Sequence, residues 1–149
     1  MEASDLPVFV HQSNWQRRML LRYGTKICLI DATYATTAYE MPLFMLCVPS
    51  NAGYLVVASF LVGDEQSKSI EAGLRTVARW CPQWQPAYMM SDYSESQISA
   101  VETVFPGMCH PLLYASNNSM AVVSRTDAKS FSSLTQPSPY IFCLCPPLA

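Results

Sequence analysis

Two aspartates follow short apolar runs in this sequence: Asp31 comes directly after residues 27–30, and Asp92 comes one residue after residues 87–90. Paired carboxylates are hard oxygen ligands of the kind that Mg²⁺ and Mn²⁺ prefer, and two-metal sites use them to clamp the attacking and leaving oxygens of a phosphodiester. If the two side chains lie together, Asp31 and Asp92 are candidate metal ligands and catalytic residues. A third carboxylate is normally needed to complete such a site.

A simpler interpretation is that each aspartate only caps the turn that follows it. Asp92 precedes a helix expected to begin at Ser94, and Asp31 could accept hydrogen bonds from the backbone of residues 32–33. Spacing alone favours this capping role over a metal site.

Strands are predicted where apolar and β-branched residues run together. Residues 27–30 read as a strand buried on both faces that ends on Asp31, and residues 41–48 and 54–62 read as two further strands. Residues 49–53 supply turn chemistry, which predicts an antiparallel hairpin with a loop of about five residues. A short fourth strand is expected at residues 87–90.

Helical spacing of apolar residues predicts three helices. They are residues 15–23 with Gly24 as the C-cap, a crossover helix with Glu65 near its start and Cys81 near its end, and a helix from Ser94 with a Ser94–Gln97 capping box. The tryptophans beside helix ends, Trp15, Trp80 and Trp84, are expected to be core anchors rather than base-stacking platforms.

This order of elements predicts an α/β fold with a three-stranded antiparallel meander, a crossover helix, a parallel strand and a further helix. A right-handed crossover would place residues 87–90 parallel to residues 27–30. Asp31 and Asp92 would then meet at the carboxyl ends of adjacent strands, where open α/β sheets usually carry their sites.

Several short stretches in this order resemble the Mutator-like (MULE) transposase domain. They are residues 29–34 (Leu-Ile-Asp-Ala-Thr-Tyr), 42–44, 51–54, the helix start at Glu65, 91–93 (Ser-Asp-Tyr) and 104–107 (Val-Phe-Pro-Gly). The resemblance covers residues 15–107, and the domesticated copies in animal SWIM zinc-finger proteins and in the calcium-responsive transcription factor are the most similar. It implies a ribonuclease-H-like fold, a nuclear location and a DNA or nuclear protein partner. It also implies that Asp31 and Asp92 correspond to the first two acidic residues of an Asp-Asp-Glu triad for metal-dependent DNA strand transfer.

The sequence departs from that family pattern after Gly107. Cys109 and His110 are adjacent, whereas the family has a Cys-x-x-His pair, and Glu102 is the last glutamate. We therefore expect a truncated domain that holds no Mg²⁺ or Mn²⁺, followed by a divergent, disordered tail over residues 108–149 in which Asp127 is the one acidic residue. Such an abrupt change of composition is typical of alternative splicing, read-through or a frameshift.

Charge argues against a free-standing nucleic-acid binder, because the formal net charge is −2 and the pI is about 5.6. Any contact with DNA must therefore be local. Four basic residues close together, Arg17, Arg18, Arg22 and Lys26, could face phosphates, although an ordinary solvated helix face is the favoured interpretation.

The six cysteines predict a reduced, intracellular protein, because the first three lie in apolar segments as small buried hydrophobes do. No secretory signal is apparent, and the apolar runs are shorter than the roughly 20 residues that span a bilayer. Cys143 and Cys145 with Cys109 and His110 lack the spacing of a structural zinc module. A cysteine–histidine catalytic pair using His11 or His110 has no identifiable orienting partner.

Three hypotheses about function follow. The first is a catalytically incomplete, transposase-derived domain that binds or scaffolds in a DNA-associated protein. The second is a metal-dependent nuclease or strand transferase whose missing carboxylate comes from a partner chain. The third is a chain without a stable fold, because the strand at residues 87–90 would be an exposed sheet edge.

Overall fold

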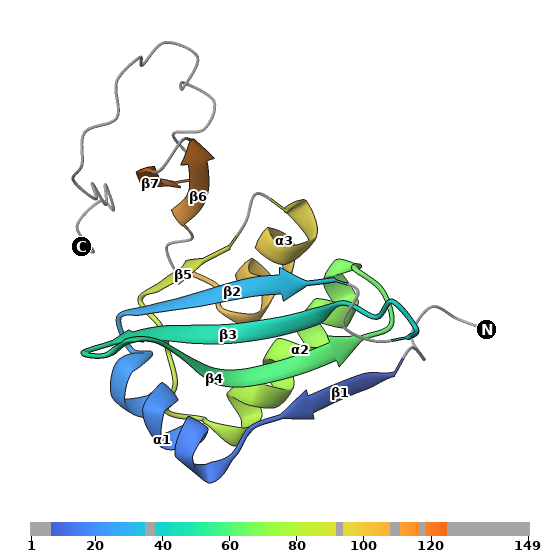
Figure 1. Ribbon diagram of the computed structural model, residues 1–149, viewed down its shortest axis with the longest axis horizontal. Helices are drawn as coiled ribbons and strands as arrows, with labels where there is room; N and C mark the ends of the chain where they lie inside the picture. Colours follow the sequence, from blue (N-terminus) through green and yellow to red (C-terminus); the bar gives the residue numbers. More distant parts are fainter. Residues whose placement is uncertain (1–6, 35–37, 92–93, 108–110, 117–118, 125–149) are drawn as a thin grey trace.

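The computed structural model describes residues 7–34, 38–91, 94–107, 111–116 and 119–124 of the chain. Its elements follow in the order β1 (Val8–His11), α1 (Asn14–Tyr23), β2 (Ile27–Thr33), β3 (Leu43–Ser50), β4 (Gly53–Val62), α2 (Ser67–Trp80), β5 (Tyr88–Met90), α3 (Glu95–Val104), β6 (Pro111–Ser116) and β7 (Ser119–Ser124). The first five strands form one mixed sheet in the order β1-β4-β3-β2-β5 (Figure 1).

The predicted meander and its parallel neighbour are both confirmed. β2, β3 and β4 pair antiparallel in sequence order, and β5 lies parallel beside β2 with Leu29 opposite Met90. The chain reaches β5 through α2, as the crossover rule requires. One strand was not foreseen: β1 pairs antiparallel with β4 at the far edge, and a run of only four residues gave too little periodicity to predict it.

Three details of the predicted strands were wrong. β2 continues through Asp31 to Thr33, so Asp31 lies within a strand and does not cap a turn. The β3–β4 loop is shorter than expected, because the ladder extends to the pair Ser50 and Gly53 and only two residues remain between them. β6 and β7 form a separate antiparallel pair in a region for which we predicted no regular element. Each segment contains a short apolar run, residues 112–115 and 120–123, and such runs are compatible with strands.

The three helices cover one face of the five-stranded sheet, behind the strands in Figure 1. Alternate strand residues point to that side, so Cys28, Ile30, Phe44 and Phe60 join the buried core with residues of all three helices, Leu20 among them. The other face, which we call the open face, carries the intervening residues.

The open face is apolar over much of its area but only partly buried. Ile27 and Leu29 of β2 are half-buried there, and Phe9, Tyr54 and Val56 are exposed. The expectation that β2 is buried on both faces was therefore wrong, since Ile27 and Leu29 are only half-buried and the three described helices lie on the other face.

Helix capping differs from the sequence prediction. The structure has a capping box at Ser13–Gln16, where the Ser13 amide donates to Gln16 Oε1 (2.8 Å) and the Gln16 amide donates to Ser13 Oγ (3.2 Å). At α3 the Ser94 side chain makes no capping hydrogen bond, and the Gln97 side chain is buried. A glutamine that packs inside the fold cannot reach back to the N-cap.

Gly24 closes α1 as predicted, but for a different reason. Its φ of −85° is accessible to any residue, so left-handed backbone is not the requirement. A Cβ here would lie 2.6 Å from the Leu20 carbonyl oxygen and 3.2 Å from Trp84 Nε1. Glycine is needed because an added Cβ would overlap the Leu20 carbonyl oxygen and the Leu20 side chain, with the Trp84 indole close by.

Cys28, Cys47 and Cys81 are free thiols. Burial raises the pKa of Cys28 far above its ordinary value, as expected for a thiol in an apolar core. No helix in the described part of the chain is long and apolar enough to cross a membrane.

Candidate acidic site

Asp31 lies in the second half of β2 and is exposed. It pairs with Met45 of β3, and since Ile30 points into the core, Asp31 points to the open face. The short strand therefore presents a solvated carboxylate beside the otherwise apolar surface of the sheet. Such a group is available to a cation or to a polar partner.

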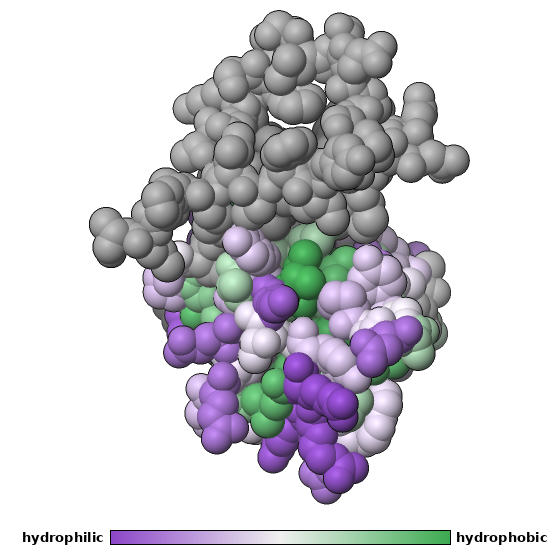
Figure 2. Space-filling view, turned by 90° about the vertical axis from the view of Figure 1, so that its left-hand side faces the viewer, coloured by the Kyte–Doolittle hydropathy of each residue, from purple (hydrophilic) through white to green (hydrophobic). Residues whose placement is uncertain are grey.

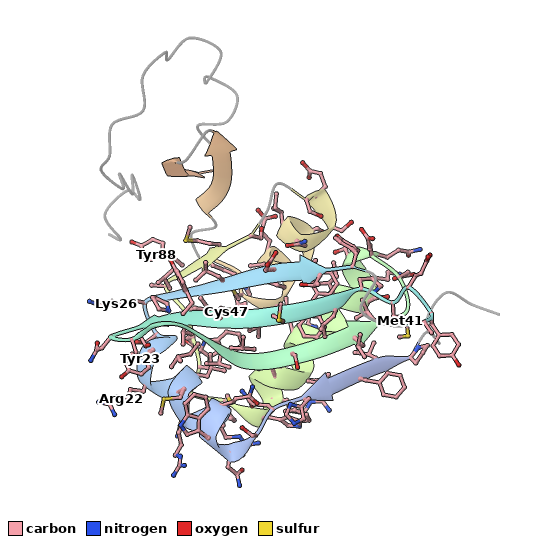
Figure 3. The ribbon with its side chains drawn as sticks, viewed as in Figure 1. Arg22, Tyr23, Lys26, Met41, Cys47 and Tyr88 are labelled. Carbon is pink, nitrogen blue, oxygen red and sulfur yellow. The ribbon has the colours of Figure 1, made fainter. Side chains whose placement is uncertain are left out.

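Cys47 is a close neighbour of Asp31 on the open face, where Figure 3 labels it on β3. Cys47 pairs with Leu29 and Asp31 pairs with Met45, so the two side chains are diagonal neighbours across the strands. Partial burial raises the pKa of the Cys47 thiol, and the negative charge of Asp31 raises it further. Cys47 is thus the group that reports on the charge of Asp31.

The parallel pairing needed to bring Asp31 and Asp92 together is present. Leu29 is opposite Met90, and the aspartates follow these two residues by two positions each. Ser91, which continues from β5, is fully buried. Asp92 itself lies outside the described residues, so a meeting of the two aspartate side chains stays a prediction.

A second carboxylate, Glu65, is linked to the end of β2 by a hydrogen bond from Tyr34. The Tyr34 hydroxyl donates to Glu65 Oε2 at 3.4 Å, which connects the segment after β2 with the segment after β4. Asp64 Oδ1 accepts from the Gln66 amide (3.1 Å), and α2 begins only at Ser67. The sequence analysis assigned Glu65 only to the start of a helix. The signal that it missed is that the acidic pair Asp64 and Glu65 directly follows β4, a strand that runs in the same direction as β2.

The described residues do not by themselves fit a divalent-metal site. Asp31 supplies a suitable hard oxygen donor, but within the described ranges no three His, Cys, Asp or Glu side chains are grouped to hold a metal ion. We therefore derive no chemical step that passes through a metal at Asp31.

The coupling between Asp31 and Cys47 predicts a measurable change in thiol reactivity. In Asp31→Asn the pKa of Cys47 should fall towards its ordinary value, because a neighbouring negative charge is lost and the thiolate becomes less unfavourable. At about pH 8, below the ordinary thiol pKa, the thiolate fraction and the rate of iodoacetamide alkylation at Cys47 should rise. Peptide-resolved mass spectrometry would measure the rate.

Two internal comparisons control this measurement. Cys28 is fully buried and should stay unreactive in both proteins, which reports on the integrity of the fold. Glu40→Gln removes a carboxylate that does not influence Cys47 and should leave its alkylation unchanged. An Asp31→Asn protein whose Cys47 reacts no faster than wild type would contradict the assigned coupling.

The remaining sequence candidates do not join this site. His11 is exposed in β1, and Cys81 is buried where its Sγ donates to Gln12 Oε1 at 3.4 Å. The supposed zinc ligands, Cys109, His110, Cys143 and Cys145, lie outside the described residues.

Helices on one face of a mixed sheet, with a carboxylate near the end of a strand flanked by a parallel neighbour, define an α/β domain of the kind that carries sites at strand ends. The family model of the MULE transposase domain matches residues 27–113, which is more than half of the chain. The chain belongs to this family. No curated protein matches it.

Proposed function

We propose that this chain carries a catalytically incomplete MULE transposase domain whose role is binding or scaffolding in a DNA-associated nuclear protein. Its fold would be the ribonuclease-H-like one over residues 15–107, and its functional counterparts would be domesticated copies in animal proteins of the SWIM zinc-finger type.

The acidic residues carry this proposal. The resemblance to the family implies that Asp31 and Asp92 would correspond to the first two members of an Asp-Asp-Glu triad, whereas beyond residue 113 Asp127 is the one acidic residue in the sequence. Strand transfer at a phosphodiester needs the carboxylates that fix two metal ions, so a domain in which only Asp31 and Asp92 serve as such ligands would be catalytically incomplete. What remains is a folded surface that can bind.

The test combines metal binding with DNA cleavage. Thermal unfolding of the full chain with and without millimolar Mn²⁺ shows whether the folded state binds metal, because a ligand specific for that state raises the midpoint. Plasmid nicking in Mn²⁺ is measured in parallel for wild type, Asp31→Asn and Asp92→Asn. We expect no nicking by any of them, whether or not Mn²⁺ raises the midpoint.

Glu40→Gln serves as the matched control, because it removes an exposed carboxylate outside the proposed acidic pair. Nicking by wild type and Glu40→Gln that disappears in either aspartate variant would overturn the proposal that the domain is catalytically incomplete. It would favour an active nuclease, including one completed by a partner chain.

A further inference from the structure

The charged residues of this fold are separated between its two ends. One end, which we call the basic end, is formed by residues 12–26, the β3–β4 turn at residues 50–54 and the segment 79–87. Its charged residues are Arg17, Arg18, Arg22, Lys26 and Arg79, with no aspartate or glutamate. The opposite end holds Asp31, Glu40, Asp64, Glu65 and Glu95, with Lys68 as its basic residue.

Hydrogen bonds between distant segments hold the basic end together. Gln16 Nε2 donates to the Val56 carbonyl oxygen (3.2 Å), and the Tyr88 amide donates to the Lys26 carbonyl oxygen (2.8 Å). Trp84 Nε1 donates to the carbonyl oxygen of Gly24 (3.2 Å). These contacts make the basic end a fixed surface of the folded domain, although its residues are far apart in sequence.

Arg18 and Arg22 are two exposed residues of this surface that lie on the same helix. They are one helical turn apart on α1, both are exposed, and neither forms an ion pair with another described residue. Like charges at this spacing destabilise a helix slightly, so the pair is not explained by stability alone. Arg22 also lies over the ring of Tyr23, 5.4 Å from its centroid, which restrains the guanidinium.

An aromatic side chain lies on the same side of α1 as the two arginines. Trp15 precedes Arg18 by three residues on α1 and is 48% exposed, whereas a core tryptophan such as Trp84 is 2% exposed. Figure 2 looks at this end of the molecule, and Figure 3 labels Arg22, Tyr23 and Lys26 there. In Figure 2 strongly hydrophilic side chains gather over the lower part, at the height where Figure 1 shows α1.

Among the described residues, the three segments that form the basic end contain no aspartate or glutamate of their own. Glu102 of α3 is the acidic residue to consider near the basic end, because it precedes Phe105 by three residues and the Phe105 ring packs on Trp84. It is half-buried and takes part in an interaction of its own. The exposed neutral neighbours are amides, Asn51, Gln83 and Gln85, which are hydrogen-bond donors suited to phosphate oxygens.

We propose that the basic end binds the phosphodiester backbone of nucleic acid, with Arg18 and Arg22 contacting phosphates and Trp15 stacking on a base. Basic side chains interleaved with an exposed aromatic ring are the combination that nucleic-acid surfaces use. An acidic protein segment would also attract the arginines, but it would not use the exposed indole of Trp15, which can stack on a base. This inference rests on the proposed binding role and deepens it, because it names the surface and the partner. The site is distinct from the acidic pair and needs no divalent metal.

The experiment measures binding of the full chain to a fluorescent DNA oligonucleotide of roughly 20 nucleotides, longer than a typical single-strand site of about 4–16. Single-stranded and duplex forms are compared by anisotropy in EDTA, from about 50 to 200 mM salt. Arg18→Gln/Arg22→Gln should weaken binding at least about fivefold and lower the salt-dependence slope by roughly 2, about one for each lost phosphate contact.

Three variants make the result specific. Lys68→Gln/Arg75→Gln removes the same net charge away from the basic end and should leave affinity and slope near wild type. Arg18→Lys/Arg22→Lys keeps both charges and should retain the slope. Trp15→Ala should weaken single-stranded DNA more than duplex, because stacking requires an unpaired base. Circular dichroism and the thermal midpoint check that every variant is folded.

The failure of this inference can be told apart from that of the proposed function. No binding in EDTA, an equal loss in the two charge-removed doubles, or competition by polyglutamate as effective as by DNA would each overturn the nucleic-acid surface while leaving the domain catalytically incomplete. DNA nicking that depends on Asp31 and Mn²⁺ would overturn the proposal of a catalytically incomplete domain. Binding of DNA through Arg18 and Arg22 could still be observed in EDTA.

Discussion

Replacing Trp84 by alanine should lower the free energy of unfolding by about 3–5 kcal/mol, the range measured for removing a large aromatic side chain from a core. Trp84 is among the largest fully buried side chains, and its ring meets Phe105 edge to face at 5.0 Å. Its Nε1 also donates to the Gly24 carbonyl oxygen, which would lose its partner. Urea unfolding at neutral pH would measure the change.

Trp80→Ala is the matched control, because Trp80 is the same residue type four positions earlier but is 37% exposed. Its loss should cost clearly less than that of Trp84. Trp84→Phe keeps the apolar contact with Phe105 and removes the hydrogen bond to Gly24, so it should fall between wild type and Trp84→Ala. Equal destabilisation by Trp80→Ala and Trp84→Ala would show that Trp84 does not anchor this core.

The three tryptophans show where local sequence reasoning stops. All three stand beside helix ends and were expected to be core anchors, yet the prediction holds only for Trp84, while Trp15 and Trp80 are substantially exposed. Helical spacing identifies a residue near a helix end but not which direction it faces once the neighbouring segment is in place. The chain around Trp84 is fixed by pairing with residues far away in sequence, such as Gly24.

Periodicity was sufficient for the elements that carry the acidic site. The apolar run before Asp31, the helical spacing from Ile70 to Cys81 and the short run at residues 87–90 predicted β2, α2 and β5, and the crossover rule then gave the parallel pair. Periodicity did not predict the residue at which β2 ends, because Asp31, Ala32 and Thr33 join the strand through their pairing with β3. Tertiary pairing overrode the polar character of this segment.

Contacts between side chains distant in sequence were beyond that reasoning. The Tyr34–Glu65 hydrogen bond joins residues 31 positions apart, and the influence of Asp31 on Cys47 depends on the register of β2 and β3. The capping box shows the same limit on a shorter scale. Ser94–Gln97 and Ser13–Gln16 have the same spacing, but only the second glutamine is free of the core and able to reach its N-cap.

The close approach of α2 to the sheet predicts a strong effect at Gly73. A Cβ at this buried helical position would overlap Cγ, Cδ2 and Cε2 of the Phe60 ring. That ring stacks on Phe44, with centroids 5.3 Å apart and planes 13° from parallel, and both phenylalanines are buried. Since the ring is buried and stacked on Phe44, Gly73→Ala should force the helix away from the sheet.

Gly73→Ala should therefore lower the free energy of unfolding by about 1–3 kcal/mol, the usual cost of overpacking a core. This loss would appear despite the gain of about 1 kcal/mol that alanine normally brings to a helix interior. The neighbouring exposed residue supplies the reference: Ala72→Gly should cost about that 1 kcal/mol, because nothing but helix propensity changes there.

A double-mutant cycle separates steric conflict from a change in the helix itself. In a Phe60→Leu background, which removes ring atoms facing Gly73, the cost of Gly73→Ala should shrink by at least about 0.5 kcal/mol, the threshold for coupling between touching residues. Urea unfolding of the four proteins gives the coupling. Additive costs, or a Gly73→Ala protein more stable than wild type, would mean that α2 does not depend on glycine to pack this closely against β4.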